Sequence, residues 1–261
     1  MMEKKQDLIV VKVGGKIVEN PAALKQLITD VAAIDKPKVL VHGGGVMATQ
    51  MAERLGIKTT MVEGRRVTDD EMLNVVTMVY GGLVNKRLVA LLQWHKQNAI
   101  GLTGADMNII LSTKRPVRTV DYGWVGDVKK TNGKALSQLI SQGVMPVIAP
   151  LTHDGKGHIL NTNADTMAAA TATALSRFYN VTLVYCFEKN GVLMNPDDDD
   201  SVISTLRLSQ YDHLKKLGII KDGMIPKLDN AFATLDNGVS QVIITKASNL
   251  GDLEKGTHIQ L

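Results

Sequence analysis

The stretch that most constrains the fold is Leu8–Lys16, where a run of mostly β-branched residues ends in two glycines and a lysine. Such a run is typical of a buried strand in a parallel sheet. Gly14 and Gly15 have no Cβ atom, so their backbone N–H groups can approach an anion closely. Lys12 lies inside the apolar run, where an unpaired ammonium group is unfavourable. The stretch predicts a strand that delivers a cation to a phosphate-sized site; the alternative is a purely structural strand end with Lys12 reaching the surface.

The same pattern occurs a second time further along the chain. Val39–His42 is another short apolar run, and Gly43-Gly44-Gly45 and an expected helix over Val46–Leu55 follow it directly. Ligands of open α/β sheets bind at the carboxyl ends of the strands, so we expect the two glycine turns side by side there. Neither turn fits the dinucleotide fingerprint or the P-loop. These residues therefore disfavour a nicotinamide or Walker-type site and leave backbone N–H donors with lysines, which suit phosphate and carboxylate groups.

Stretches with strand and helix periodicity alternate along the rest of the chain. This order favours an α/β fold, a three-layer αβα sandwich with a largely parallel central sheet and two lobes that share it. We expect the lobes at residues 1–176 and 177–261. Val117–Asp121 and Trp124–Val128 alternate about Tyr122-Gly123, which predicts a β-hairpin with a two-residue turn. The other predicted strands are Ile100–Leu102, Ile109–Ser112, Met145–Pro150, Val181–Cys186 and Gln241–Thr245, and helices are predicted at Lys134–Gln142, Ser209–Leu217 and from Gly223 to Asn237.

The composition narrows the classes of partner. The 261 residues are 44% hydrophobic and 21% charged, as in an ordinary soluble globular protein, and the net charge is +4. Aromatic residues make up only 4%, so the clustered basic charge with stacking aromatics of a nucleic-acid binder is not expected. Met1–Asp7 is polar and too short for a signal peptide, and no apolar stretch is expected to approach the length of a membrane span. We predict a cytoplasmic protein with neither a nucleic-acid nor a membrane partner.

Two features could suggest a metal or redox site. Cys186 is the only cysteine, which excludes an intramolecular disulfide and a cysteine-based metal cluster, and its apolar surroundings favour an inert buried thiol. Asp197–Asp200 is a run of four acids, but successive side chains of an extended segment point in alternating directions. We therefore interpret the run as a solvated loop and predict no metal ligand in the protein.

Taken together, the motifs resemble the amino-acid kinase superfamily and, within it, the N-acetylglutamate kinase family. They occur in the family's order over nearly the whole chain, and they are specific as a set although each is weak alone. The matching segments are Lys12-Val13-Gly14-Gly15, His42-Gly43-Gly44-Gly45, Gly64-Arg65-Arg66-Val67-Thr68, Asn85-Lys86, Val125-Gly126-Asp127-Val128, Asn161-Thr162-Asn163-Ala164-Asp165 and Asp222-Gly223-Met224-Ile225-Pro226-Lys227.

The resemblance implies transfer of the ATP γ-phosphoryl group to the γ-carboxylate of an N-acylated glutamate, in the second step of arginine biosynthesis. It also implies the roles of the matching residues. Lys12 and Lys227 contact the transferring phosphoryl group from opposite lobes, and Asp165 holds the two lysines in place. Gly14 and Gly15 bind the phosphates of ATP through their N–H groups. Mg²⁺ is expected to be carried by the phosphates, without a protein ligand.

The substrate side follows from the same resemblance. Gly44 and Gly45 are expected to donate N–H groups, and Arg66 and Asn161 to hold the α-carboxylate of the N-acyl-L-glutamate. A planar guanidinium group suits bidentate binding of a carboxylate better than an ammonium group does. A carboxylate is already ionised at neutral pH, so the chemistry needs no general base. Stabilisation of charge on the moving phosphoryl group is the main task, and fixed N–H groups and lysines suit it.

The chain departs from the family pattern in two places. Cys186–Val192 reads CFEKNGV where the family is close to LTDVxGV, so Glu188 takes the acidic position and the adenine contacts are left unassigned. Gly104–Met107 reads GADM where the family has Gly-x-Asp-Gly. That segment and the predicted hairpin are expected near the acyl group, so N-succinylglutamate is an alternative to N-acetylglutamate. Further alternatives are a sister kinase acting on aspartate, glutamate or carbamate, and a non-catalytic effector-binding domain, which the presence of both lysines and Asp165 disfavours.

The N-terminal segment bears on assembly. Arginine-inhibited members of the family carry an extra helix before the first strand, which links dimers into a hexamer, whereas here Met1–Asp7 precedes Leu8. Seven polar residues offer at most about two turns of helix and no apolar face. The resemblance therefore implies a homodimer, built on a helix and a sheet edge of the N-terminal lobe and insensitive to arginine.

Overall fold

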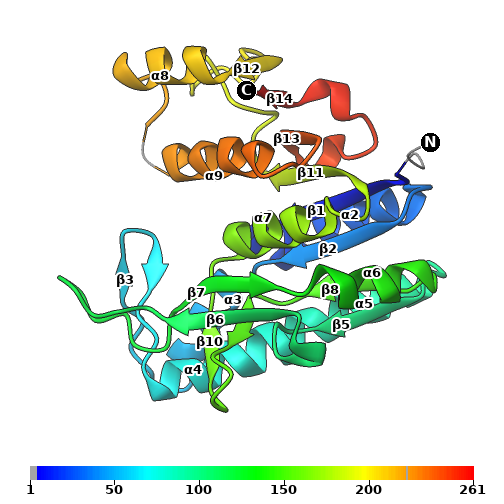
Figure 1. Cartoon of the computed structure of the whole chain (residues 1–261). Coiled ribbons are helices and arrows are strands. Elements are labelled where there is room, and N and C mark those ends of the chain that lie inside the picture. Colours follow the sequence, from blue (N-terminus) through cyan, green and yellow to red (C-terminus); the bar gives the residue numbers. More distant parts are fainter. Residues whose placement is uncertain (1–4, 222) are drawn as a thin grey trace.

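An eight-stranded sheet runs through the molecule and carries helices on both faces (Figure 1). The computed structural model describes residues 5–221 and 223–261, so part of the polar leader and Asp222 of the last motif lie outside the described residues. Six strands are parallel, and β14 and β12 run the opposite way at one edge. In spatial order, the strands are β12 (Thr205–Arg207), β14 (Thr257–Gln260), β13 (Gln241–Lys246), β11 (Asn180–Phe187), β1 (Asp7–Val13), β2 (Lys38–His42), β8 (Met145–Ile148) and β5 (Ala99–Leu102).

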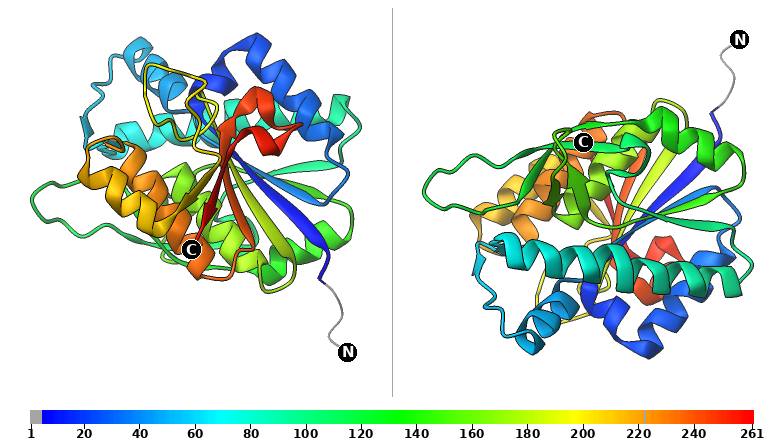
Figure 2. Two further views of the ribbon diagram at one scale, coloured as in Figure 1. Left: turned by 90° about the horizontal axis from the view of Figure 1, so that it is seen from above. Right: turned by 90° about the horizontal axis from the view of Figure 1, so that it is seen from below.

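Helices cover both faces of the sheet (Figure 2), and a hydrophobic core on each face holds them in place. Side chains of a strand alternate between the faces, so Leu8 and Val10 of β1 join one core and Val11 and Val13 join the other. Lys12 therefore points to the same face as Leu8 and Val10. The helices of that face are α6 (Gly133–Ser141), α7 (Ala164–Leu175), α8 (Leu208–Lys216) and α9 (Met224–Asp236). The opposite face carries α1 (Gly15–Glu19), α2 (Pro21–Ala33), α3 (Gly45–Arg54), α4 (Asp70–Val76), the π-helix η1 (Thr77–Val84) and α5 (Asn85–Trp94).

The three-layer α/β architecture with a mostly parallel sheet is confirmed, and smaller elements complete it. A four-stranded sheet in the order β10-β9-β6-β7 lies beside the N-terminal half, and β3 pairs with β4 in a short hairpin. The predicted strand at Ile109–Ser112 corresponds to β6, whereas β3, β4, β9 and β10 have only two or three residues each, too few for a periodicity to be detected. Their bounds are β10 (Ile159–Asn161), β9 (Leu151–His153), β6 (Ile110–Lys114), β7 (Gly126–Thr131), β3 (Met61–Val62) and β4 (Arg65–Arg66), and short 3₁₀ turns are η2 (Asp106–Asn108), η3 (Ala247–Asn249) and η4 (Leu253–Lys255).

The predicted hairpin about Tyr122-Gly123 is wrong. Strand β7 pairs antiparallel with β6, and residues 115–125 form a long connection that projects from the body of the molecule (Figure 2). The turn residues bind elsewhere: Tyr122 O accepts from Thr68 N at 3.0 Å, and Trp124 N donates to Thr68 O at 2.6 Å. The backbone groups that a hairpin needs are therefore used to hold this connection against the segment after β4.

The long helix from Asp70 to Trp94 corrects the expectation about membrane spans. By length and composition alone, its 25 residues are long and apolar enough to cross a membrane. Much of the helix packs on the sheet, and Val75, Val76 and Leu88 have no exposed surface. A buried core helix passes the same test, so the helix by itself is a weak sign of a membrane span.

Candidate active site

The two glycine turns lie side by side at the carboxyl ends of β1 and β2. Val13 is in register with His42, and Gly43 N donates to Val13 O at 3.0 Å. A Cβ atom added to Gly15 would lie 3.2 Å from Gly45 N, and one added to Gly43 would lie 3.1 Å from Gly15 N. A Cβ atom at either position would make a tight contact with the backbone of the other turn, so glycine favours this close approach and leaves backbone N–H groups without side chains at the strand ends.

A buried ion pair lies next to these turns. Lys12 Nζ is 2.6 Å from Asp165 Oδ1, and the two side chains are only 8% and 15% exposed. Asp165 is in the first turn of α7, where Asn163 caps the helix by accepting from the Asp165 and Thr166 N–H groups. Because Lys12 shares the face of β1 that packs on α7, the alternation of the strand brings the ammonium group to the start of that helix.

A second lysine reaches the same place from the C-terminal half of the chain. Lys227 is in the first half of α9. Burial lowers the pKa of its ammonium group, the Asp165 carboxylate raises this pKa, and the neighbouring Lys12 charge lowers it further. The Lys227 ammonium group lies 3.9 Å from the centre of the Phe187 ring, and the Lys12 ammonium group lies 5.0 Å from it. Phe187 ends β11, the strand that pairs with β1. Two cations from different elements thus meet over one aromatic ring, which the sequence analysis did not single out.

A cavity of about 200 Å³ opens on the other side of the glycine turns. Arg66 is buried in its wall, where Nη2 donates to Gly45 O at 2.7 Å and to Thr49 Oγ1 at 2.9 Å. Asn161, at the end of β10, donates from Nδ2 to Thr68 Oγ1 at 2.9 Å. The lining contains two arginines and no acidic residue, so the cavity suits an anionic ligand. Its walls are formed by Gly43, Gly44, Gly45, Met61, Gly64, Arg65, Arg66, Tyr80, Val125, Pro150, Asn161, Thr162, Asn163 and Ala164.

The structure brings the predicted residues into two adjoining groups. Lys12, Asp165 and Lys227 form the cation cluster, and Gly44, Gly45, Arg66 and Asn161 line the cavity. Gly14 and Gly15 lie where the two groups meet, since the Gly15 turn contacts Gly44 and Gly45. An anion held by the cluster could therefore be placed next to a second anion held in the cavity.

Buried polar and aromatic groups that the sequence analysis left aside support the glycine loop from below. His42 is fully buried, and burial lowers its pKa to about 4, so the ring is neutral at pH 7. Its Nδ1 atom lies 2.8 Å from Gly43 O, and its Nε2 atom lies 3.1 Å from Asn85 Nδ2. Tyr80 of the π-helix packs so closely on Gly44 that a Cβ atom there would lie 2.9 Å from the Tyr80 ring. The Asn85-Lys86 motif signalled this support only in part.

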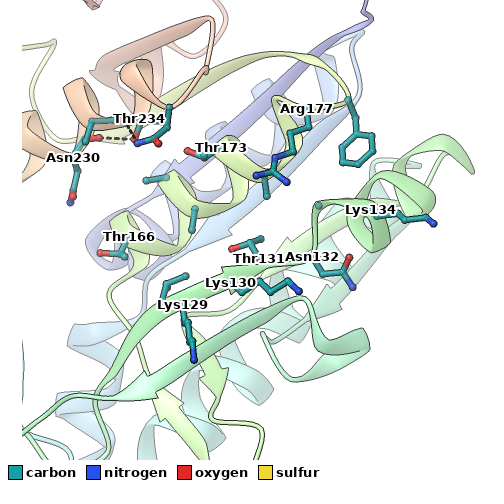
Figure 3. Close-up of a pocket in the computed structure, with 18 residues that line it drawn as sticks. Lys129, Lys130, Thr131, Asn132, Lys134, Thr166, Thr173, Arg177, Asn230 and Thr234 are labelled. Carbon is teal, nitrogen blue, oxygen red and sulfur yellow. Dashed lines mark hydrogen bonds between the residues drawn. The ribbon is translucent and has the colours of Figure 1, made fainter.

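A larger hollow of about 670 Å³ lies between the two halves of the molecule (Figure 3). Lys129 and Lys130 of β7 border it on one side and α9 on the other, with α7 as its floor and Arg177 at one end. None of the predicted site residues lines it. Size alone therefore does not mark the candidate active site in this chain.

The expectations about metals and cysteine can be compared with the described residues. In residues 5–221 and 223–261 no group of three or more His, Cys, Asp or Glu side chains could hold a metal ion. Asp199 of the acidic run is exposed and lies 2.6 Å from Lys189 Nζ. Cys186 is fully buried, as predicted, and burial raises the pKa of its thiol to about 12, which disfavours a reactive thiolate.

Comparison with known proteins agrees with this geometry. Residues 7–246 match the Amino acid kinase family. The chain belongs to the amino acid kinase family. It is 60% identical to the acetylglutamate kinase of Phocaeicola vulgatus over 248 residues, which is 95% of this chain and 96% of that protein. It is 59% identical to the acetylglutamate kinase of Bacteroides thetaiotaomicron, with 98% of this chain and 99% of that protein covered.

Solved structures share the fold of this chain. A Streptococcus mutans UA159 protein superimposes with a TM-score of 0.80 at 28% identity, covering 97% of this chain and 98% of that one. Carbamate kinase from Giardia lamblia bound to AMP-PNP gives a TM-score of 0.69 at 15% identity and covers 99% of both chains. The second likeness concerns the fold alone.

Proposed function

We propose that this chain is an acetylglutamate kinase, which transfers the γ-phosphoryl group of ATP to the γ-carboxylate of N-acetyl-L-glutamate. The product is N-acetyl-L-glutamyl 5-phosphate, and the reaction is the second step of arginine biosynthesis. Relatives at about 60% identity over nearly the full chain carry this name. The observation that carries the proposal is the meeting of Lys12, Asp165 and Lys227 beside a cavity with a buried arginine and no acidic lining.

The residues at the strand ends fit a nucleotide triphosphate. The turns at Gly14–Gly15 and Gly43–Gly45 pack closely together and can present backbone N–H groups, and two ammonium groups lie beside them. Gly14, Gly15, Lys12 and Lys227 would hold the phosphates. Mg²⁺, which prefers phosphate and water oxygens, would neutralise charge on the phosphates when bound and needs no dedicated protein cage. The use of ATP as the phosphoryl donor also favours a cytoplasmic location.

The transfer is a displacement at phosphorus. An oxygen of the ionised γ-carboxylate attacks the γ-phosphorus, the bond from that phosphorus to the bridging oxygen breaks, and ADP leaves with the electron pair. No proton is moved, so a general base is not needed. Lys12 and Lys227 would stabilise negative charge on the moving group from opposite sides. Asp165, 2.6 Å from Lys12, would hold the lysines in position rather than act as a base.

The cavity would orient the acyl amino acid. Arg66 already donates from Nη2 to Gly45 O and Thr49 Oγ1, which fixes the guanidinium plane. With Asn161 it would bind the α-carboxylate, and Gly44 and Gly45 would donate N–H groups to the substrate. Prior immobilisation of the arginine reduces the ordering that substrate binding requires.

We further propose that residues 1–176 form the N-acylglutamate-binding lobe and residues 177–261 the ATP-binding lobe. A homodimer through the N-terminal lobe is supported by exposed apolar side chains on one helix and the adjoining edge strand. Met78, Leu83 and Trp94 of the long helix are 54%, 47% and 68% exposed, and Ile100 of β5 is 37% exposed. Apolar side chains grouped in this way on a surface favour a protein contact.

The function is tested with a substrate panel. Purified protein is incubated with ATP, Mg²⁺ and each of N-acetylglutamate, N-succinylglutamate, glutamate, aspartate and carbamate, and acyl phosphates are trapped with hydroxylamine. We expect the highest kcat/KM with N-acetylglutamate. A preference for the succinyl compound would keep the chemistry and change the acyl group, whereas a preference for an unacylated acid would refute the proposal.

The dimer is tested by light scattering after size exclusion. We expect a mass near twice 28.3 kDa for the wild-type chain. Leu83→Glu combined with Trp94→Glu should shift it to the monomer, and Phe178→Glu, an exposed apolar position away from this helix, should not. A dimer that survives the double substitution would place the interface elsewhere.

A further inference from the structure

Phe187 occupies an unusual position in the cation cluster. Its ring lies 3.9 Å from the Lys227 ammonium group and 5.0 Å from that of Lys12, measured to the ring centre. Both distances are within the range of a cation–π interaction, in which the negative face of an aromatic ring attracts a cation. One ring therefore contacts the two lysines that come from β1 and α9.

A second aromatic ring lies beside Phe187 on the same face of β11. Tyr185, two residues earlier on β11, lies almost parallel to Phe187, with ring centres 6.0 Å apart and an angle of 3° between the planes. Tyr185 is fully buried, and its hydroxyl group lies 3.4 Å from Asp165 O. The position of Phe187 is thus set by a strand end and a packed neighbour, and a free surface ring would have neither.

Lys227 needs such a partner more than Lys12 does. Asp165 lies at ion-pair distance from Lys12, but in the part of the chain that the structure describes no carboxylate oxygen lies within 4.0 Å of Lys227 Nζ. The charged groups that face Lys227 are Asp165 and Glu188, which favour its charged form, and Lys12 and Lys16, which oppose it; burial opposes it most.

We propose that Phe187 is a positioning residue whose aromatic face holds Lys227, and more loosely Lys12, as charged ammonium groups ready to meet the transferring phosphoryl group. This inference rests on the proposed kinase function. It concerns a residue that acts through the lysines, because nothing in the geometry requires the ring to touch the reacting atoms. The hydrophobic bulk of a leucine could fill the same space but could not attract the cations.

Fluorination separates the two roles. Each fluorine added to a phenyl ring weakens its negative face while nearly preserving its shape. In the full-length enzyme, Phe187 is replaced by 4-fluoro-, 3,5-difluoro- and 3,4,5-trifluorophenylalanine, and kcat and both KM values are measured. We expect kcat to fall stepwise, to a total loss of about 5- to 30-fold, with the KM of N-acetylglutamate within about twofold of wild type.

The pH profile gives a second readout. The ring favours the charged form of Lys227, so weakening it lowers the pKa of this lysine further below its ordinary value. The charged form is then lost at a lower pH. The alkaline limb of the kcat–pH profile should therefore shift to lower pH with each added fluorine. Phe187→Tyr, which keeps an aromatic face, should retain most of the activity, and Phe187→Leu should behave like the trifluoro variant.

The matched control is the same fluorinated series at Phe178, which is 41% exposed on the border of the large hollow. We expect kcat and the pH profile of these proteins to match wild type, and thermal melts of both series confirm that the variants fold. A trifluoro variant at Phe187 with kcat within twofold of wild type overturns the inference, as does a series that changes only the KM of ATP. Failure of the function itself would appear separately, as a wild-type protein that forms no acyl phosphate.

Discussion

Replacing Asp165 by asparagine tests the buried ion pair directly. The side chains of Lys12 and Asp165 are 8% and 15% exposed, so water screens their interaction little. Removing one partner of a buried pair leaves an uncompensated charge and costs about 3–5 kcal/mol of unfolding free energy. The asparagine Oδ1 atom can still accept from Lys12, so we take the lower end, about 3 kcal/mol. For a chain of this size that corresponds to a fall in Tm of roughly 6–12 °C.

The assay is a thermal melt followed by circular dichroism at pH 7. A second variant shows that the loss comes from the unpaired charge. Adding Lys12→Met to Asp165→Asn removes the ammonium group as well, so the melting temperature should recover most of the difference while activity stays lost. This combination also separates a folding defect from a catalytic one.

The chain provides a matched control for this substitution. Lys189 and Asp199 are also 2.6 Å apart, but their side chains are 51% and 54% exposed. Because solvent screens an exposed pair, Asp199→Asn should leave Tm within about 2 °C of wild type. If Asp165→Asn melts within the same 2 °C, or if both variants lose the same amount, burial is not what makes the Lys12–Asp165 pair important.

Three further predictions concern single side chains. Lys227→Ala should lower kcat by about 10²-fold or more with a much smaller effect on both KM values, because its charge matters most during transfer; near-normal kcat in a folded variant would make this lysine structural. Arg66→Lys should raise the KM of N-acetylglutamate and leave that of ATP nearly unchanged, since an ammonium group loses the paired donors; steady-state kinetics with each substrate varied would reveal the opposite pattern if Arg66 served the nucleotide. Burial lowers the pKa of His42 to about 4 from 6.5, so the unfolded chain binds a proton more readily; stability is fully present above pH 6.5 and is lost as the pH falls towards 4, by about 3 kcal/mol in all. Urea unfolding of His42→Gln should show a weaker pH dependence over this range, and parallel curves for variant and wild type would contradict it.

Local patterns carried most of the information about the fold. The apolar run of β1 ends at Gly14, and that of β2 ends at Gly43, so strand, turn and helix could be recognised from adjacent residues. Parallel strands meet at one edge, which is why the prediction that the two glycine turns lie side by side is confirmed. The division at residues 176 and 177 stays a prediction, as do the roles of the individual site residues.

Contacts between distant segments were harder to foresee. The connection before β7 alternates like a hairpin, but its turn bonds to Thr68, more than fifty residues earlier, and nothing local signals that choice. Phe187 is an apolar residue at the end of an apolar strand, so periodicity assigns it to the core. Its contact with Lys227 depends on how α9 packs across the sheet. The one signal in the sequence was that Phe187 takes the place of the threonine in the family pattern LTDVxGV.

The π-helix within the long helix alters what this part of the chain can tolerate in length. Residues Thr77–Val84 wind with i→i+5 hydrogen bonds, so each turn holds about one residue more than an α-helical turn does. Within this segment Val79, Tyr80 and Val84 are buried, so its core-facing side chains join those of α4 and α5. If one residue were deleted inside this segment, α-helical winding could return while the flanking helices kept their faces towards the core. The same deletion in α4 or α5 would rotate one end of the helix against the other and carry Asn85 away from His42. A one-residue gap in an alignment of relatives is therefore best accommodated here.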